Sequence, residues 1–360
     1  MISYSGLESA AGPVAGIRTF LRSVLSRGLA EAVLVAARTP YSNLPMPLLI
    51  VDPDKIDLAD PLAPAAPFNA ARQASKLCRG GVEKKLALVL RPCEIRALVE
   101  LVKLRQADLE NVLLISFDCP GRMENDLFLP QAEKSENLTE DFLKKEELRD
   151  LAAPACRICI GFQAPPLADV NIRVYGDVLG ASAETAKGEA ALAALGLVPG
   201  PLPEAFQGRA EELLHKRTAA RRERLAATRD RVKDLDGLEK ALANCLNCYN
   251  CRTACPVCYC RECVFLTDVF AHDPELYFRR AERRGAVKIP TDTTMFHLTR
   301  LAHMSHACVG CGQCSSVCPS SIPVADIFMA AAEKTQELFG YNPGQDPDQP
   351  IPYLAFDREN

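Results

Sequence analysis

Two apolar runs, at residues 86–90 and at 112–117 with Ser116 as the one polar position, are the clearest hydrophobic pattern in the first half of the chain. Runs of this length are typical of strands that are buried on both faces. Between them, Ile95, Leu98 and Val102 lie at helical spacing and predict an amphipathic helix. A strand, a helix and a second buried strand form a βαβ unit with parallel strands and a right-handed crossover. We therefore expect an α/β domain in the N-terminal half.

Upstream of this unit, the pattern predicts one helix, one apolar run and a long loop. The helical pattern begins near residue 14, and Gly28 marks its expected end before the apolar run at 32–36. Residues 38–67 contain seven prolines and predict a loop that is interrupted by one short strand at 48–51. A loop of that length in a compact domain is more often a wrap that faces a ligand or a partner than idle chain.

Beyond the unit, the pattern divides the chain into further segments after an N-terminal domain of residues 1–185. The charged stretch 133–150 predicts a solvated helix. Residues 186–240 are rich in Ala, Glu, Arg and Leu and predict an exposed helical connector, with a docking surface for an acidic partner as the alternative. Helical spacing between the cysteine groups of 241–335 predicts an α-helical ferredoxin-like domain. The polar, proline-rich tail at 336–360 is expected to extend over a partner or to be disordered.

Composition narrows the class of protein without changing this division. The chain has 360 residues, 48% of them hydrophobic and 24% charged, which is ordinary for a globular protein. Its net charge of −4 does not indicate a nucleic-acid or anionic-membrane partner. No run of about eighteen apolar residues is present, and residues 1–26 lack the features of a signal peptide. The expected location is the cytoplasm.

Two copies of the spacing C-x-x-C-x-x-C-x-x-x-C-P, which is that of bacterial ferredoxins, begin at Cys245 and Cys308. Three cysteines at these intervals can bind one cubane, and in two-cluster ferredoxins the fourth cysteine ligates the other cluster. Zinc also binds paired C-x-x-C motifs, but it does not require the third cysteine or the C-P ending. The spacing therefore predicts electron transfer by two [4Fe–4S] clusters, held by Cys245, Cys248, Cys251 and Cys318, and by Cys308, Cys311, Cys314 and Cys255.

Cysteines also stand at the ends of the predicted strands. Cys93 and Cys119 each follow one strand of the βαβ unit closely, so both are expected at the sheet edge where open α/β sheets hold ligands. Either cysteine alone would more commonly be a small buried residue. A third element, Cys156-x-x-Cys159, is ambiguous among an iron–sulfur cluster, a zinc site and a redox dithiol.

Three cysteine motifs stand together in residues 70–180: Arg91-Pro92-Cys93-Glu94, Asp118-Cys119-Pro120-Gly121 and Cys156-Arg157-Ile158-Cys159, followed by Ala168-Asp169-Val170 and Gly176-Asp177. With these motifs, residues 70–180 resemble the beta subunits of deazaflavin-reducing hydrogenases and of deazaflavin-linked formate dehydrogenases. The C-terminal double ferredoxin pattern resembles the formate dehydrogenase branch in particular.

The resemblance implies that the N-terminal domain carries FAD and a third [4Fe–4S] cluster. The implied ligands of that cluster are Cys93, Cys119, Cys156 and Cys159. No G-x-G-x-x-G follows a predicted strand, so a Rossmann dinucleotide site is not expected and the flavin would be bound in the family's own way. Arg91 and Arg122 are candidates for pairing with the flavin's phosphates, with structural ion pairs as the alternative.

Three further thiols follow the first ferredoxin motif directly, at Cys258, Cys260 and Cys263. Together with Cys78 they are candidates for a fourth cluster, and the alternative is free thiols that are shielded inside the domain. His303 and His306 precede Cys308, and packing or capping is preferred to a ligand role for both.

These features predict an iron–sulfur flavoprotein subunit that transfers electrons between a hydride carrier and the clusters of a larger complex. The carrier would be a deazaflavin or a nicotinamide, and the complex a formate dehydrogenase, hydrogenase or heterodisulfide-reductase-type assembly. The alternatives are a flavin-free electron-transfer adaptor and a scaffold structured by zinc. No ligand set for molybdenum, tungsten or nickel is evident, so formate or hydrogen chemistry is expected on another subunit.

Overall fold

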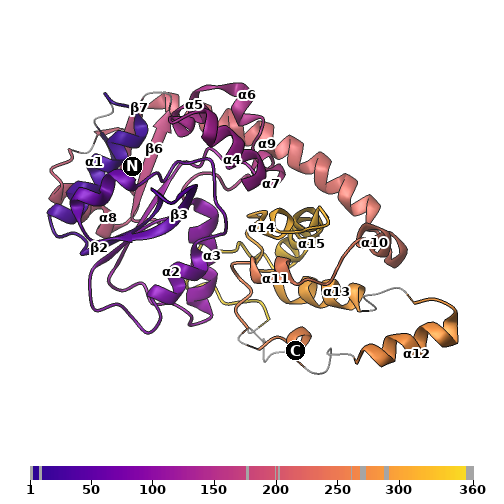
Figure 1. The fold of residues 1–360 in the computed structure, drawn as a ribbon. Coiled ribbons are helices and arrows are strands. Elements are labelled where there is room, and N and C mark those ends of the chain that lie inside the picture. The colour runs from indigo at the N-terminus through magenta and orange to yellow at the C-terminus, as the bar shows by residue number, and fades with distance from the viewer. Residues whose placement is uncertain are drawn as a thin grey trace.

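The structure is a computed structural model in which a mixed sheet, flanked by helices, is joined to a smaller helical part (Figure 1). No described helix is long and apolar enough to cross a membrane. The structure describes residues 3–7, 10–175, 178–198, 200–201, 203–260, 262–267, 273–287 and 292–353. Four residues of the sequence patterns therefore lie outside the described residues: Gly176, Asp177, Asp268 and Val269.

The described strands form one eight-stranded sheet of order β3-β2-β4-β5-β6-β7-β1-β8. The central strands β2, β4, β5 and β6 pair in parallel, and the remaining pairs are antiparallel. The predicted βαβ unit is confirmed as β4, α3 and β5. The bounds of the strands are β1 Ser3–Gly6, β2 Ala32–Thr39, β3 Ser42–Ile50, β4 Leu86–Val89, β5 Val112–Phe117, β6 Val170–Tyr175, β7 Val178–Ala183 and β8 Gly200–Pro201.

Helices cover both faces of the sheet because alternate residues of its buried strands point to opposite sides. Leu86 and Leu88 face the core that contains α2 and α3, whereas Ala87 and Val89 face the core that contains α1 and α8. The helices of this part, with the short 3-10 helix η1, are α1 Pro13–Ser26, η1 Pro53–Leu58, α2 Ala71–Leu77, α3 Pro92–Lys103, α4 Asn125–Lys134, α5 Leu138–Lys144, α6 Glu146–Arg149, α7 Pro154–Arg157 and α8 Ala186–Ala194.

The regular secondary structure in the described residues of the C-terminal part is helical, with loops between the helices. Its core includes Phe265, Phe296 and Phe328 and continues without a break into the α2–α3 face of the sheet. The two parts therefore share one hydrophobic core and are packed together. The helices of this part, with the long helix that leads to it, are α9 Glu204–Arg231, α10 Leu235–Ala241, α11 Asn250–Thr253, η2 Val264–Leu266, α12 Pro274–Arg284, α13 Thr293–Met304, α14 Gln313–Ser316 and α15 Val324–Leu338.

The expectation of a long proline-rich loop at 38–67 is wrong in its first third. Residues 42–50 form β3, a complete edge strand that pairs with β2 and contains Pro45 and Pro47. Proline is tolerated on an edge strand because its missing N–H is not needed by a second neighbour. The rest of the segment, from η1 to Pro67, does wrap around the carboxyl ends of the central strands.

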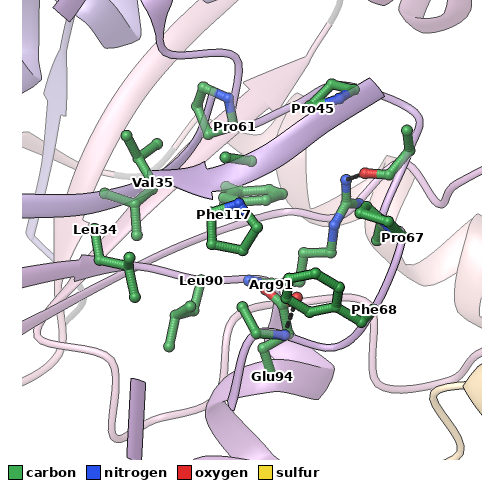
Figure 2. Close-up of a pocket in the computed structure, with 16 residues that line it drawn as sticks. Leu34, Val35, Pro45, Pro61, Pro67, Phe68, Leu90, Arg91, Glu94 and Phe117 are labelled. Carbon is green, nitrogen blue, oxygen red and sulfur yellow. Dashed lines mark hydrogen bonds between the residues drawn. The ribbon is translucent and has the colours of Figure 1, made fainter. Parts of the chain in front are cut away.

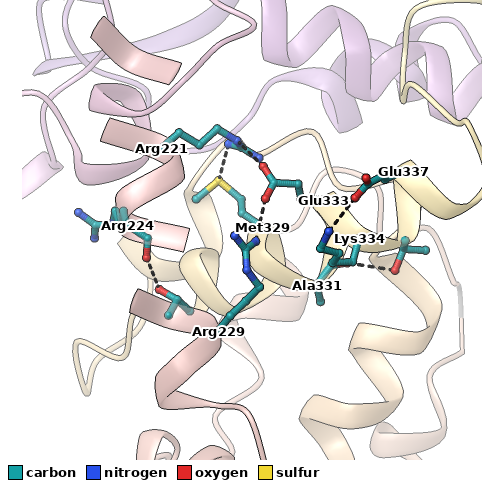
Figure 3. A network of polar contacts seen from close by, with 10 residues as sticks. Arg221, Arg224, Arg229, Met329, Ala331, Glu333, Lys334 and Glu337 are labelled. Carbon is teal, nitrogen blue, oxygen red and sulfur yellow. Dashed lines mark hydrogen bonds and ion pairs between the residues drawn. The ribbon is translucent and has the colours of Figure 1, made fainter. Parts of the chain in front are cut away.

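The predicted connector at 186–240 is divided between the two parts. Helix α8 and strand β8 belong to the sheet. Helix α9 runs from the sheet to α10 and packs along α15 (Figure 1). Its arginines bind the chain's own acidic residues, since Arg221 and Arg229 pair with Glu333 of α15 (Figure 3). Arg224 pairs with Asp326, also on α15. The arginine-rich face of α9 is thus an internal contact between the two parts.

The described part of the C-terminal tail packs on its own chain. Tyr341 is 2% exposed, and its hydroxyl donates to the buried carboxylate of Glu100 on α3 at 2.6 Å. The backbone N–H of Gly344 donates to the same carboxylate at 2.8 Å. The expectation of an extended or disordered tail is therefore wrong for residues 341–344, because a buried acceptor on α3 holds them.

Gly188 on α8 provides a test of the helix–sheet packing. A Cβ at this position would overlap the backbone carbonyl of Asp169, which precedes β6. We expect Gly188→Ala to lower the free energy of unfolding by about 1–3 kcal/mol through overpacking. Gly208→Ala on exposed α9, where a Cβ meets open space, is the matched control and should raise stability by about 0.5–1 kcal/mol. Urea unfolding of the two variants measures the difference, and equal midpoints would contradict the packing.

Candidate functional site

The thiols of the N-terminal half converge on one cavity. Cys93 lies in the first turn of α3 just after β4, and Cys119 lies just after β5, at the carboxyl ends of parallel strands. Cys156 belongs to the short helix α7, and Cys159 follows it directly. All four thiols line the same cavity, which Cys311 of the C-terminal part also lines. The predicted set of four is thus assembled, and the ferredoxin part closes the cavity.

The two ferredoxin motifs form a second and a third cavity. Cys255, Cys308, Cys311 and Cys314 line one, and the other is lined by the remaining set, Cys245, Cys248, Cys251 and Cys318. The fourth cysteine of each motif lies with the first three of the other motif. This exchange is the arrangement that the spacing predicts for two-cluster ferredoxins.

Corresponding residues of the two motifs adopt the same backbone conformation. Asn247 and Tyr249 in the first motif have φ of 49° and 57°, and Gly310 and Gly312 in the second have φ of 68° and 78°. Each pair stands two and four residues after the first cysteine of its motif. Left-handed residues between the cysteines turn the chain sharply. The same turn, present in both motifs, brings the three thiols of a seven-residue segment onto one cavity.

The cavities form a continuous series. The thiol cavity of the N-terminal half shares Gly310 and Cys311 with the cavity of the Cys308 set. Arg300 lines that second cavity and donates to the sulfur of Cys251, which lines the third. At the far end Cys248 is exposed, and its neighbour Leu246 is 63% exposed. The thiols thus extend from the sheet edge to the protein surface.

A fourth cavity, without thiols, adjoins the series at its inner end. It lies over the carboxyl ends of β4 and β5 and is bounded by the wrap that ends at Pro67 (Figure 2). Its walls are mainly apolar, including Val35, Phe68 and Phe117. It shares Ala66, Arg91 and Glu94 with the cavity of the N-terminal thiols. The apolar pocket and the first thiol cavity are therefore adjacent and share part of their walls.

Burial disfavours the charged form of these thiols. It raises the pKa of Cys311 to about 12, raises that of Cys93 well above its usual value, and also raises the pKa of Cys156. Buried thiols of this kind become thiolates when a metal coordinates them.

The candidate phosphate ligands Arg91 and Arg122 are both buried and bound to protein groups. Arg91 donates to the carbonyls of Ala63, Ala65 and Gly121, and to the sulfur of Cys119 at 3.5 Å. These contacts use four of the five N–H donors of a guanidinium. Arg91 thereby holds the wrap against the sheet edge beside a thiol.

Arg122 links the two parts of the chain at the thiol cavity. It pairs with Glu124 at 3.0 Å and donates to Ser316 of α14. Burial lowers the pKa of its guanidinium, but the negative charge of Cys156 and then of Glu124 raises the pKa overall. The contacts of both arginines favour the alternative of structural ion pairs and hydrogen bonds over phosphate binding.

Two side chains on α13 that contact candidate ligand sulfurs were not found from the sequence. His297 Nε2 lies 3.4 Å from the sulfur of Cys245, and Arg300 donates to the sulfur of Cys251 at 3.1 Å. Both side chains lie on the buried face of α13, with exposed fractions of 2% and 4%. The sequence did contain a signal for them, since a histidine and an arginine stand among the apolar residues of the buried face of α13, such as Phe296 and Met304.

None of the four cavities described above is lined by a member of the candidate fourth set, Cys78, Cys258, Cys260 and Cys263. Cys78 ends α2 and is fully buried, and burial, with a smaller contribution from Asp108, raises its pKa to about 11. Cys260 is exposed, and Cys258 lies near Cys255. His306 packs against Tyr341 and Tyr353, which agrees with the packing interpretation.

The residues present fit iron–sulfur clusters better than zinc. Each of the three sets provides four thiols around a cavity, and the described residues contain no group of three or more His, Cys, Asp or Glu close enough to hold a single metal ion. A tetrahedral zinc site would need its sulfurs about 2.3 Å from one point. All described cysteines are free, with no disulfides among them.

Comparison with known proteins supports the same chemistry. Residues 242–322 match the family model of the 4Fe-4S dicluster domain. The F420-dependent formate dehydrogenase subunit beta of Methanocaldococcus jannaschii is 25% identical over 93% of this chain and 92% of its own length. The chain is therefore similar to that beta subunit over nearly its whole length. The resemblance inferred from the cysteine motifs is thereby confirmed.

A second relative, the F420-dependent formate dehydrogenase 1 subunit beta of Methanococcus maripaludis, is 29% identical over 74% of this chain and 75% of its own length. Among solved structures, the F420-reducing [NiFe] hydrogenase complex from Methanosarcina barkeri contains a chain with 13% identity and a TM-score of 0.46. That match covers 65% of this chain and 93% of that one, and it is too distant to bear on the fold.

Glu94 tests how the start of α3 is joined to the start of α2 at the sheet edge. Its buried carboxylate accepts from the backbone N–H groups of Arg91 at 2.8 Å and of Ala70 at 2.9 Å. We expect Glu94→Ala to lower the free energy of unfolding by about 1–3 kcal/mol, because two buried donors lose their acceptor. Exposed Glu110→Ala should change it by less than about 0.5 kcal/mol. Equal urea midpoints for the two variants would contradict this role of Glu94.

Proposed function

We propose that this chain is an iron–sulfur flavoprotein subunit that carries electrons between a hydride carrier and a larger formate-oxidising complex in the cytoplasm. The observation that carries the proposal is the continuous series of three four-thiol cavities, which begins at an apolar pocket and ends at the surface. The name of the relatives, which are F420-dependent, supports a deazaflavin as the carrier.

We assign the apolar pocket over β4 and β5 to the flavin ring. Ligands of open α/β sheets bind at the carboxyl ends of the strands, and a flat aromatic ring suits a mainly apolar pocket with few polar groups. Phe68 and Phe117 offer aromatic walls, and Arg91 and Glu94 offer polar contacts (Figure 2). These two charged residues also line the first thiol cavity, so a ring bound here would lie beside the first cluster.

The three thiol sets would each hold one [4Fe–4S] cluster. Cys93, Cys119, Cys156 and Cys159 would hold the cluster nearest the flavin. The set that includes Cys308 would hold the middle cluster, and the set that includes Cys245 the outermost. A flavin supplies conversion between two-electron hydride transfer and one-electron transfer, which is the reason for pairing it with cubanes. The protein contributes two ferredoxin sets that are packed into one core and a first set whose cavity shares Gly310 and Cys311 with the middle one.

Formate oxidation itself would take place on another subunit of the complex. Exposed Leu246 and Cys248 lie where the outermost set reaches the surface, and this is where a partner subunit would receive electrons.

Blocking the pocket tests the flavin assignment. Ala36 and Ala32 are both half-buried on β2, but only Ala36 lines the pocket. We expect Ala36→Leu to reduce FAD per protein by at least about fivefold, since added bulk in a filled site costs about 1–3 kcal/mol. Ala32→Leu should retain FAD, and both should retain iron. FAD extraction with absorbance spectroscopy measures the result. Unchanged FAD in Ala36→Leu would place the ring elsewhere, and wild-type protein with iron but no FAD would favour the flavin-free adaptor.

Removing thiols tests the ligand sets. We expect about twelve iron atoms in the anaerobically purified protein, four for each cubane. Cys119→Ala should lower the iron content by up to about four atoms, because one ligand of the first set is lost. Cys78→Ala should leave it unchanged, since Cys78 ends α2 away from the three cavities. Iron and acid-labile sulfide analysis provides the readout. About sixteen iron atoms, with loss in Cys78→Ala, would instead establish the fourth cluster.

A further inference from the structure

Arg300 on α13 is a buried cation that lies between the two ferredoxin thiol sets. It is 4% exposed, and its guanidinium donates to the sulfur of Cys251 at 3.1 Å and to the carbonyl of Cys251 at 3.2 Å. The guanidinium lies 4.5 Å from the ring centroid of Phe328 and 5.5 Å from that of Phe296. These contacts fix the position of the charge within the core.

No carboxylate among the described residues forms an ion pair with Arg300. A buried charge without a partner is strongly unfavourable. The sulfur of Cys251, which accepts from Arg300, supplies the counter-charge once metal coordination converts the thiol to a thiolate.

The contacts of Arg300 are unequal for the two sets. Its hydrogen bonds within the described residues go to Cys251, a member of the outermost set, and not to a sulfur of the middle set. His297, one turn earlier on α13, adds a contact from Nε2 to Cys245, which belongs to the same outermost set. Helix α13 thus places a guanidinium and an imidazole against sulfurs of the outermost set, while Arg300 also lines the cavity of the middle set.

We propose that Arg300 is a positioning residue that raises the reduction potential of the outermost cluster above that of the middle cluster. The inference rests on the proposed function, because it requires both clusters to be present. Positive charge and hydrogen bonds to sulfur favour the reduced, more negative state of a cluster. One electron then leaves the middle site, which is oxidised, and enters the outermost site, which is reduced, with no proton transferred. Arg300 thereby makes the outermost cluster, which lies at the surface end of the series, the cluster on which an added electron is most stable.

The test is an EPR-monitored redox titration of the holoprotein with Arg300→Gln, Arg300→Lys and Arg229→Gln. Arg229 pairs with Glu333 and has no described contact with a thiol, so its variant is the control for loss of an arginine that lies away from the thiol sets. For Arg300→Gln we expect the oxidised-to-reduced ratio of the outermost cluster, at a fixed potential, to rise at least tenfold, which is a downward shift of about 59 mV for one electron. The middle cluster should shift less in the same direction, and the N-terminal cluster and the control should not shift.

Arg300→Lys keeps the charge but cannot span both acceptors on Cys251, so a smaller downward shift is expected. This variant carries the test if Arg300→Gln does not assemble its clusters. If Arg300→Gln has full iron content and unshifted potentials, the inference is overturned and the proposed function is unaffected. The same outcome in Arg300→Lys overturns it if only that variant assembles its clusters. Wild-type protein that lacks iron would contradict the proposed function itself, and the two failures are thereby distinguished.

Discussion

The burial of thiols around cavities is the constraint on which the rest of the structure depends. Thiols such as Cys93 and Cys311 are held where burial strongly favours their neutral form, and they form no disulfides among the described residues. Coordination to iron removes that penalty by converting buried thiols into metal-bound thiolates. Because the Cys311 loop also closes the cavity of the N-terminal thiols, the two parts of the chain are expected to assemble together with their metal rather than independently.

Arginines complement the negative charge that these sites imply. Arg91 and Arg122 stand at the first set, beside Cys119 and Cys156, and Arg300 stands between the other two. Each is nearly fully buried, whereas a typical arginine is exposed. The same side chains also join distant segments: Arg91 holds the wrap to the sheet edge, and Arg122 reaches Ser316 of the ferredoxin part. Electrostatic complementarity and tertiary packing are therefore provided by the same residues.

Sequence patterns predicted the parts of this structure that depend on local spacing. The βαβ unit followed from apolar runs, and the convergence of Cys93 with Cys119 followed from the rule that parallel strands share a carboxyl edge. They failed where tertiary context decides the outcome. Edge strand β3 tolerates Pro45 and Pro47 because no further strand needs their N–H groups, and the tail at Tyr341 is ordered by a carboxylate some 240 residues away in the sequence. Arg300 and His297 were missed because helical spacing identifies a buried face but not which thiols it meets.

The central claim is that three four-thiol sets hold cubanes in series beside a flavin. Anaerobic purification of the full chain, followed by iron, acid-labile sulfide, zinc and FAD analysis with EPR of the reduced protein, tests it most directly. The account predicts about twelve iron and twelve sulfide per chain, one FAD and interacting [4Fe–4S] signals. A colourless protein with zinc in place of iron, or one whose C-terminal thiols are paired as disulfides, would contradict it.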